Sequence, residues 1–131
     1  QAAWCQLNRG RIRRLLGYYG IQTSRMVKVS GCAHLPVIFY PGMHRALFRI
    51  KKACALANAE IGALKPEISR AVVEACDRAL AGEFDKKFQL DMWQAGGYTC
   101  VNMNVNEVIG NAANEILTGR KVRTPCTRTP M

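Results

Sequence analysis

The stretch GGYTCVNMNVNEVIGNAANEIL, residues 96–117, has the most informative residue pattern of this sequence. Two glycines and a threonine open it, and five asparagines then alternate with apolar residues. Asparagine is a weak residue for a helix interior, because its side chain competes for nearby backbone groups. Helical spacing nevertheless relates the apolar positions Val105, Val108, Ile109, Ala112, Ile116 and Leu117. We therefore predict a helix over residues 102–117, with Gly119 as its C-terminal stop.

The residues before this helix are suited to binding a small anion. Gly96 and Gly97 allow backbone conformations closed to other residues, and Thr99 adds a hydroxyl. A helix start presents N–H groups and a partial positive charge, which favour a carboxylate. The alternative interpretation is structural: Asn102 caps the helix and the other asparagines satisfy loop backbone. The residues alone leave both interpretations open.

Two further helices are predicted upstream. Residues 43–61 form an amphipathic helix ended by Gly62, with an apolar face of Leu47, Ile50, Cys54, Ala57 and Ile61. A second helix starts at Pro66, a residue suited to the first helical position, and Gly82 closes it. The short joint between them predicts an antiparallel pair.

The remaining segments are predicted to be irregular. Residues 17–25 resemble a turn followed by an extended piece, and residues 34–42 a strand or an irregular connector. Residues 83–97 are predicted to form a loop with buried aromatic side chains, namely Phe84, Phe88 and Trp93. The predicted fold class is mainly α, with an irregular N-terminal third followed by about three helices.

Composition narrows the class of protein. The 131 residues suffice for one domain, and no segment approaches the roughly 20 apolar residues of a bilayer span. The net charge of +10 belongs to the two ends, because residues 36–120 hold ten cations and nine acids. An arginine-rich N-terminus is a weak signal for nucleic acid, so we expect no such partner and no membrane.

The cysteines and histidines show no metal-ligand spacing. The six cysteines lie far apart, and we expect reduced thiols in a cytoplasmic protein, with Cys54 and Cys76 buried on helix faces. His34 and His44 have no partner pattern, so neither receives a role.

The sequence WQAGGYTCVNMNVNEVIGNAANEIL closely resembles the N-terminal signature of the aspartase/fumarase superfamily, in which W/Y-Q-x-G-[SAG]-x-T leads into N-M-N-x-N-E-V. The segments YYGIQTSR and IKKACALANAEIGAL resemble two further segments of that family, and the likeness covers about residues 11–119. Details such as NEILTG make the aspartate ammonia-lyase branch the most similar, with a fumarase-type hydratase as the alternative.

The resemblance implies a cofactor-independent lyase that acts on a small dicarboxylate, aspartate or fumarate, in a homotetramer whose active site is shared by three chains. The family's substrate-binding threonine maps onto Thr99, with Gly97 and Tyr98 in the adjacent loop positions. Asn102, Asn104, Asn106 and Glu107 become supporting residues of that site. The expected fold is the N-terminal domain of the family, truncated before the central helical bundle.

Several departures from the family pattern qualify this expectation. Tyr98 replaces a common glycine, and Gly97 a frequent serine. The mobile loop with the family's catalytic serine is not in this sequence, so no catalytic residue is assigned and no activity is expected of the chain alone. Residues 1–119 are expected to be a partial lyase domain, and residues 120–131 a divergent basic tail.

One hypothesis is that a frameshift near Lys121 explains why this tail differs from the family. Suitable synonymous codons for the tail residues, read in a shifted frame, can encode the His-Pro-Asn sequence that the family has at this point. Two further alternatives stay open: a basic nucleic-acid-binding module, and a non-functional remnant whose apolar helix faces would favour aggregation.

Overall fold

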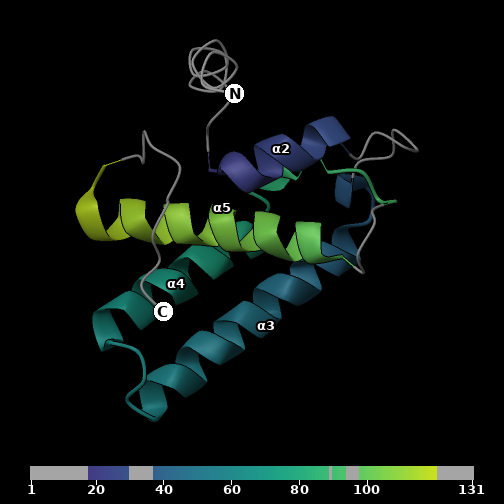
Figure 1. Ribbon diagram of the computed structural model, residues 1–131. Coiled ribbons are helices and arrows are strands. Elements are labelled where there is room, and N and C mark those ends of the chain that lie inside the picture. Colours follow the sequence, from purple (N-terminus) through teal and green to yellow (C-terminus); the bar gives the residue numbers. More distant parts are fainter. Residues whose placement is uncertain (1–17, 30–36, 89, 94–97, 121–131) are drawn as a thin grey trace.

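A computed structural model describes residues 18–29, 37–88, 90–93 and 98–120, and the described part is mainly α-helical (Figure 1). Its elements are α2 (Ile21–Val29), the 3-10 turn η1 (Val37–Phe39), α3 (Pro41–Glu60), α4 (Pro66–Leu80), the 3-10 turn η2 (Asp85–Lys87) and α5 (Thr99–Thr118). The mainly α prediction is therefore confirmed for these residues.

The long helix α5 lies between the other helices. It packs against α2 on one side and against α3 and α4 on the other (Figure 1). Because α5 has neighbours on both sides, its buried residues extend over a broad arc of the helix, from Asn104 and Asn111 on one side through Val108 to Ala113 on the other. This central position explains why its sequence looks less amphipathic than that of a surface helix.

The predicted antiparallel pair of α3 and α4 is confirmed. Pro66 occupies the start of α4, and Gly62 and Gly82 adopt positive φ angles of 73° and 90° just after the two helices. The pair is cross-linked by polar contacts as well as by packing. Lys52 Nζ lies 2.6 Å from Asp77 Oδ1, and the buried Ser69 hydroxyl donates to the Ala55 carbonyl oxygen at 3.0 Å.

The core has two parts. The larger cluster lies among α3, α4 and α5 and includes Phe48, Cys76, Phe84, Phe88, Val105, Val108 and Ala112. A smaller cluster, Val37, Leu90 and Val101, joins η1 and the segment after η2 to the start of α5. The Val37 N–H donates to the Leu90 carbonyl oxygen at 2.8 Å, so two segments far apart in sequence meet beside the first turn of α5.

Several local predictions were wrong. Ile21 to Val29 is helical, although residues 17–25 were predicted to be a turn and an extended piece. For residues 34–42 the strand alternative was wrong. Residues 37–39 form a 3-10 turn, which fits the irregular connector, and residues 34–36 lie outside the described residues. Trp93 is 65% exposed rather than buried, because the chain bends after Leu90. The Trp93 N–H donates to Asp91 Oδ1 at 2.9 Å in that bend.

The apolar face predicted for α3 was also wrong. The residues of α3 that enter the core are His44, Phe48 and Ala55, whereas Ile50, Cys54, Ala57 and Ile61 are exposed. Cys76 is buried as predicted, and burial raises the pKa of its thiol to about 11. Among the described residues, Cys54, Cys76 and Cys100 form no disulfide, and their reduced state in the cell stays a prediction.

Candidate functional site

The start of α5 is the centre of the predicted site. Tyr98 is the N-cap residue and has a left-handed backbone, with φ 67° and ψ 11°. Thr99 is the first helical residue and is exposed. Gly96 and Gly97 lie outside the described residues, and the substrate-binding roles predicted for Gly97, Tyr98 and Thr99 stay predictions.

The alternative interpretation, in which Asn102 caps this helix, was wrong on this point. Asn102 lies within the first turns, where its N–H donates to the Tyr98 carbonyl oxygen at 3.0 Å. The left-handed conformation of Tyr98 turns the chain sharply, and the helix therefore begins three residues earlier than predicted. A non-glycine residue in this conformation is uncommon and costs of the order of 1 kcal/mol.

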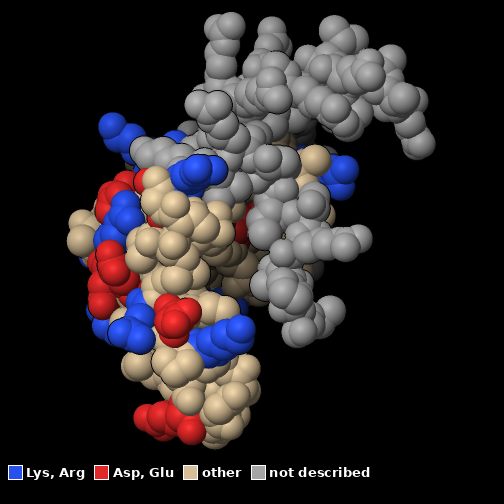
Figure 2. Space-filling view, turned by 90° about the vertical axis from the view of Figure 1, so that its left-hand side faces the viewer, with Lys and Arg blue, Asp and Glu red and all other residues tan. Residues whose placement is uncertain are grey.

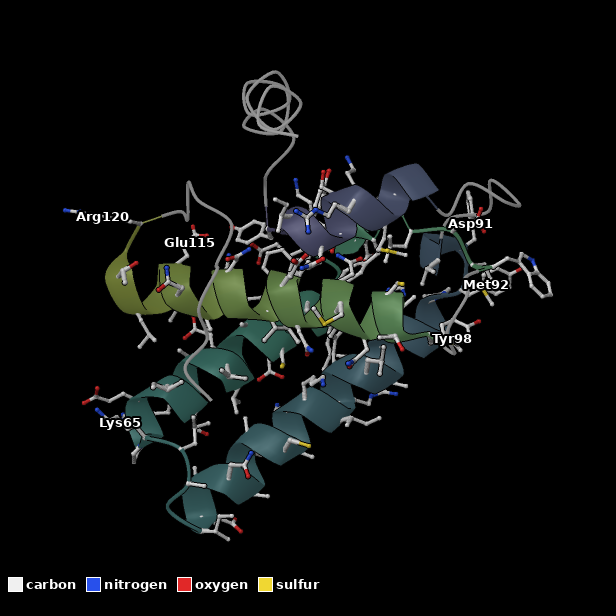
Figure 3. The ribbon with its side chains drawn as sticks, viewed as in Figure 1. Lys65, Asp91, Met92, Tyr98, Glu115 and Arg120 are labelled. Atoms are coloured by element: carbon white, nitrogen blue, oxygen red, sulfur yellow. The ribbon has the colours of Figure 1, made fainter. Side chains whose placement is uncertain are left out.

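The electrostatics of this helix end favour an anion. No side chain at the N-cap position hydrogen-bonds to the first turn, and the first turn contains no acidic residue. A 20-residue helix has a partial positive charge at its N-terminus, where the first N–H groups have no partner within the helix. Figure 3 shows Tyr98 at the same end of the molecule as Asp91 and Met92, on the segment that precedes the helix.

Glu107 holds the N-terminus of α2 onto α5. Its Oε2 accepts hydrogen bonds from the Gly20 N–H at 2.8 Å, the Thr23 N–H at 3.2 Å and the Thr23 hydroxyl at 2.6 Å. Its Oε1 accepts from the Gln22 N–H at 3.1 Å. One carboxylate thus satisfies several N–H groups of a helix start and complements its positive end.

Gly20 permits this close approach. A Cβ atom on Gly20 would lie 2.6 Å from Glu107 Oε1, well inside van der Waals contact. The glycine of the YYGIQTSR segment and the glutamate of the NMNVNEV segment are therefore two halves of one contact. The pattern analysis missed this contact, because an isolated Tyr-Gly pair predicts a turn and carries no information about a carboxylate 87 residues away.

Three polar side chains of α5 share the side that faces this segment. Asn104, Glu107 and Asn111 are spaced by three and four residues, which places them along one stripe of the helix. Asn111 Nδ2 donates to the Tyr18 carbonyl oxygen at 2.7 Å. Asn104 is 1% exposed, and its amide atoms have no hydrogen-bond partner among the described residues.

The other asparagines differ in their surroundings. Asn102 is half-buried, whereas Asn106 and Asn114 are exposed. The Asn114 carbonyl oxygen accepts a hydrogen bond from the Thr118 hydroxyl at 2.7 Å. Hydrogen bonds to neighbouring segments thus link Glu107 and Asn111 to the residues before and within α2. The supporting roles of Asn102, Asn104, Asn106 and Glu107 in a substrate site stay predictions.

The sequence analysis assigned no role to His44, and the structure shows that its side chain is fully buried. Its ring stacks on Phe88, with centroids 5.2 Å apart, and meets Phe48 edge-on. Burial lowers its pKa, and the Asp85 carboxylate, 3.7 Å from Nε2, opposes this shift only in part. No sequence signal marks this residue, because two of its partners, Asp85 and Phe88, lie far along the chain in and just after η2.

The charged residues of the described part do not gather into an extended patch of one sign on the face shown in Figure 2, where basic and acidic side chains are interleaved. Within the described residues, no group of His, Cys, Asp and Glu side chains has the arrangement of a metal site. None of the described helices combines the length and the apolar character needed to cross a bilayer.

Comparison with known proteins places these features in a family. A family described as lyase matches residues 18–129. The chain is 42% identical over 106 residues to a class II fumarate hydratase of Thermosynechococcus vestitus, covering 79% of this chain and 22% of that protein. It is also 42% identical over 104 residues to an aspartate ammonia-lyase of Pseudomonas fluorescens, with the same two coverages.

Solved structures agree with the sequence matches. A fumarate lyase of Brucella melitensis, described as fumarate lyase:delta crystallin, superposes with a TM-score of 0.77 at 40% identity, over 80% of this chain and 24% of that one. A class II fumarase of Schistosoma mansoni gives a TM-score of 0.74 at 31% identity, over 87% of this chain and 24% of that one. The chain thus spans about a fifth of the length of the curated relatives that it matches. It belongs to the lyase family of the aspartase/fumarase superfamily.

Proposed function

We propose that this chain is the N-terminal part of a lyase that forms fumarate from a small dicarboxylate, with aspartate as the substrate and ammonia as the leaving group. The single observation that carries the proposal is the start of α5, where the exposed Thr99 follows the left-handed Tyr98 at an acid-free helix N-terminus. A hydroxyl and backbone N–H groups together are suited to one substrate carboxylate.

The proposed chemistry requires a developing negative charge to be stabilised. Removal of a proton next to a carboxylate gives a dianionic intermediate, and fixed donors lower the free energy of that state. In this proposal Thr99 and Gly97 bind a carboxylate, Tyr98 shapes the loop, and Glu107 and the asparagines support the helix. The base and the remaining substrate contacts would come from other parts of a full-length homotetramer, so the chain alone is expected to be inactive.

The second candidate is a fumarase-type hydratase, in which water takes the place of ammonia. The specific observation in its favour is that the fumarate hydratase and the aspartate ammonia-lyase named above have the same identity to this chain, 42%. The residues that distinguish ammonia from water as the leaving group therefore need not lie in the aligned part.

The test is a graft. Residues 18–120 replace the aligned segment in an aspartate ammonia-lyase from Pseudomonas and in a class II fumarase. Fumarate formation from aspartate or from malate is then followed by ultraviolet absorbance. The proposal predicts activity within about tenfold of the parent in the aspartase graft, because the site loop is retained, and a larger loss in the fumarase graft. Folded, tetrameric grafts without activity in either scaffold would contradict a lyase function for this segment.

A further inference from the structure

Two titratable side chains meet inside the molecule, His44 on α3 and Asp85 on η2, and the proposed site uses neither. The His44 side chain is fully buried, and its ring nitrogens have no hydrogen-bond partner among the described residues. Asp85 Oδ1 is also buried without a hydrogen bond, and it lies 3.7 Å from His44 Nε2, beyond hydrogen-bond distance. Most buried polar groups are hydrogen-bonded, so a change of charge on this pair has a large effect on the packing around it.

The surroundings of His44 suit a neutral ring. Phe88 stacks on the imidazole with centroids 5.2 Å apart, and Phe48 meets it edge-on at 5.8 Å. Helices α4 and α5 contribute uncharged side chains to the same core, among them Ala75 and Val105. An imidazolium loses its hydration in such surroundings, so a proton on the ring raises the free energy of this arrangement.

The charged groups near His44 do not fully compensate for this loss. Burial is the largest influence on the pKa of His44 and lowers it. The Asp85 carboxylate and the Tyr40 backbone oppose this change in pKa, whereas the positive charge of Arg45 adds to it. Two further cations belong to η2, Lys86 and Lys87. The neutral ring is therefore the form that the observed packing favours.

The segment opposite His44 is short and is attached through a few contacts. We call residues 85–88, 90 and 91 the η2 segment. Its Phe88 and Leu90 side chains enter the core, and the Leu90 carbonyl oxygen accepts a hydrogen bond from the Val37 N–H at 2.8 Å. The backbone hydrogen bonds of η2 itself are local, as that from the Lys87 N–H to the Phe84 carbonyl oxygen shows. Such a segment opens at a lower free energy than packed helices do.

Phe84, directly before the η2 segment, is held separately. Its ring centroid lies 4.5 Å from that of Tyr18, and the Arg78 guanidinium lies 5.4 Å from the centre of the same ring. Opening of the η2 segment can therefore end at Phe84 and leave α4 and α5 in contact. At the other end of the segment, Leu90 packs with Val37 and with Val101 in the first turn of α5.

We propose that His44 is a proton-sensitive switch, in which uptake of a proton by its ring releases the η2 segment from α3 while α3, α4 and α5 stay packed. The release separates Leu90 from Val37 and Val101, so its effect reaches the start of α5. This switch does not depend on the proposed lyase function.

Fluorine NMR of the full 131-residue chain tests the proposal, with 4-fluorophenylalanine at its four phenylalanine positions. Phe88 reports on the η2 segment, Phe84 on the core that stays packed, and Phe39, which is 69% exposed, gives the resonance of an exposed ring. Saturation-transfer experiments detect a minor state at Phe88. Its population should rise at least about fivefold between pH 7.5 and pH 5.5, because opening takes up one proton near the ordinary histidine pKa of about 6.5. Phe84 should show no such state.

Hydrogen exchange provides a second measurement. The protection factor of the Val37 amide, relative to an unstructured peptide at the same pH, should fall by the same factor, because its acceptor on Leu90 moves away. The Val108 amide, inside α5, should keep its protection over this pH range.

The His44→Leu variant is the matched control, because leucine keeps an apolar side chain at this position and takes up no proton. Circular dichroism checks that it folds, and His44→Met serves in its place if it does not. The control keeps the other groups that titrate in this pH range or lie in the η2 segment, namely His34, Asp85 and Asp91. Neither the Phe88 population nor the Val37 protection factor should depend on pH in this variant.

Three results would overturn the proposal. The first is a Phe88 population that stays constant between pH 7.5 and pH 5.5 in the parent chain. The second is a minor state in which Phe84 and Phe88 change together, because the whole core would then open. The third is an equal pH response in the folded His44 variant, because another group would then be responsible.

Discussion

The Glu107 carboxylate joins two sequence segments that are separated by more than 80 residues. Its four hydrogen bonds reach Gly20, Gln22 and Thr23, so the start of α2 depends on a residue in the middle of α5. Helix α2 has only nine residues, which is too short for a stable helix in isolation. Its helical state therefore depends on tertiary contacts of this kind.

We predict that Glu107→Gln lowers the free energy of unfolding by about 2 kcal/mol, because it removes the charge at the helix start and one acceptor. Urea unfolding followed by circular dichroism measures this change. The control Glu74→Gln alters an exposed carboxylate on α4 and should change stability by less than about 0.5 kcal/mol. Equal effects of the two substitutions would show that the Glu107 contacts contribute nothing specific.

The buried His44 predicts a pH dependence of stability. Its pKa is lowered in the folded chain, so the unfolded chain takes up a proton first as the pH falls. Stability should therefore decrease below about pH 6.5, the ordinary histidine value, by up to about 1.4 kcal/mol per pH unit until the folded-state pKa is reached. Urea midpoints between pH 8 and pH 5 measure this slope.

The His44→Phe variant is the control for that prediction, because a phenylalanine keeps an aromatic ring between Phe48 and Phe88. Its stability should fall less steeply than that of the parent below pH 6.5. Identical slopes in the two proteins would mean that His44 is not the group responsible.

For the helices, proline and glycine residues predicted where each helix begins and ends more reliably than apolar periodicity predicted which side of a helix faces the core. Pro66, Gly62, Gly82 and Gly119 stand at helix boundaries as predicted, since each acts through its own backbone. The core-facing side of α3 could not be chosen from periodicity, because the helix carries two apolar stripes. The buried stripe of α3 includes His44. Because histidine is not counted as an apolar residue, periodicity did not indicate that this stripe faces the core.

Gly110 provides a test within α5. It lies in the middle of the helix, on its exposed face, and a Cβ atom at this position would meet no atom within 4 Å. We predict that Gly110→Ala raises the free energy of unfolding by about 0.5–1 kcal/mol, because alanine loses less backbone entropy on folding. Thermal unfolding followed at 222 nm would measure the gain. The matched substitution Gly119→Ala should instead cost about 1 kcal/mol, since Gly119 has a φ of 66°. A destabilised Gly110→Ala variant would contradict the description of α5.

For the whole molecule, the sequence indicated the family and the helical class, and both are confirmed. The same sequence could not reveal which distant segments meet, as Glu107 with Gly20 and His44 with Phe88 show. For the candidate site, the role predicted for Thr99 stays a prediction. The helix start was wrongly placed at Asn102, because a left-handed Tyr98 leaves no signature in residue type. Nor can this portion alone distinguish ammonia from water as the leaving group, since relatives of both kinds match it equally.

We claim that the start of α5 binds a substrate carboxylate, and the Thr99→Ala substitution in the active graft tests this claim. Thr118→Ala, the same substitution of an exposed threonine at the other end of the same helix, is the matched control. We predict that Thr99→Ala lowers kcat/KM for the dicarboxylate at least about tenfold, the loss expected for one hydrogen bond to a charged group, while Thr118→Ala leaves it unchanged. Equal kcat/KM values for the two folded variants would contradict the claim.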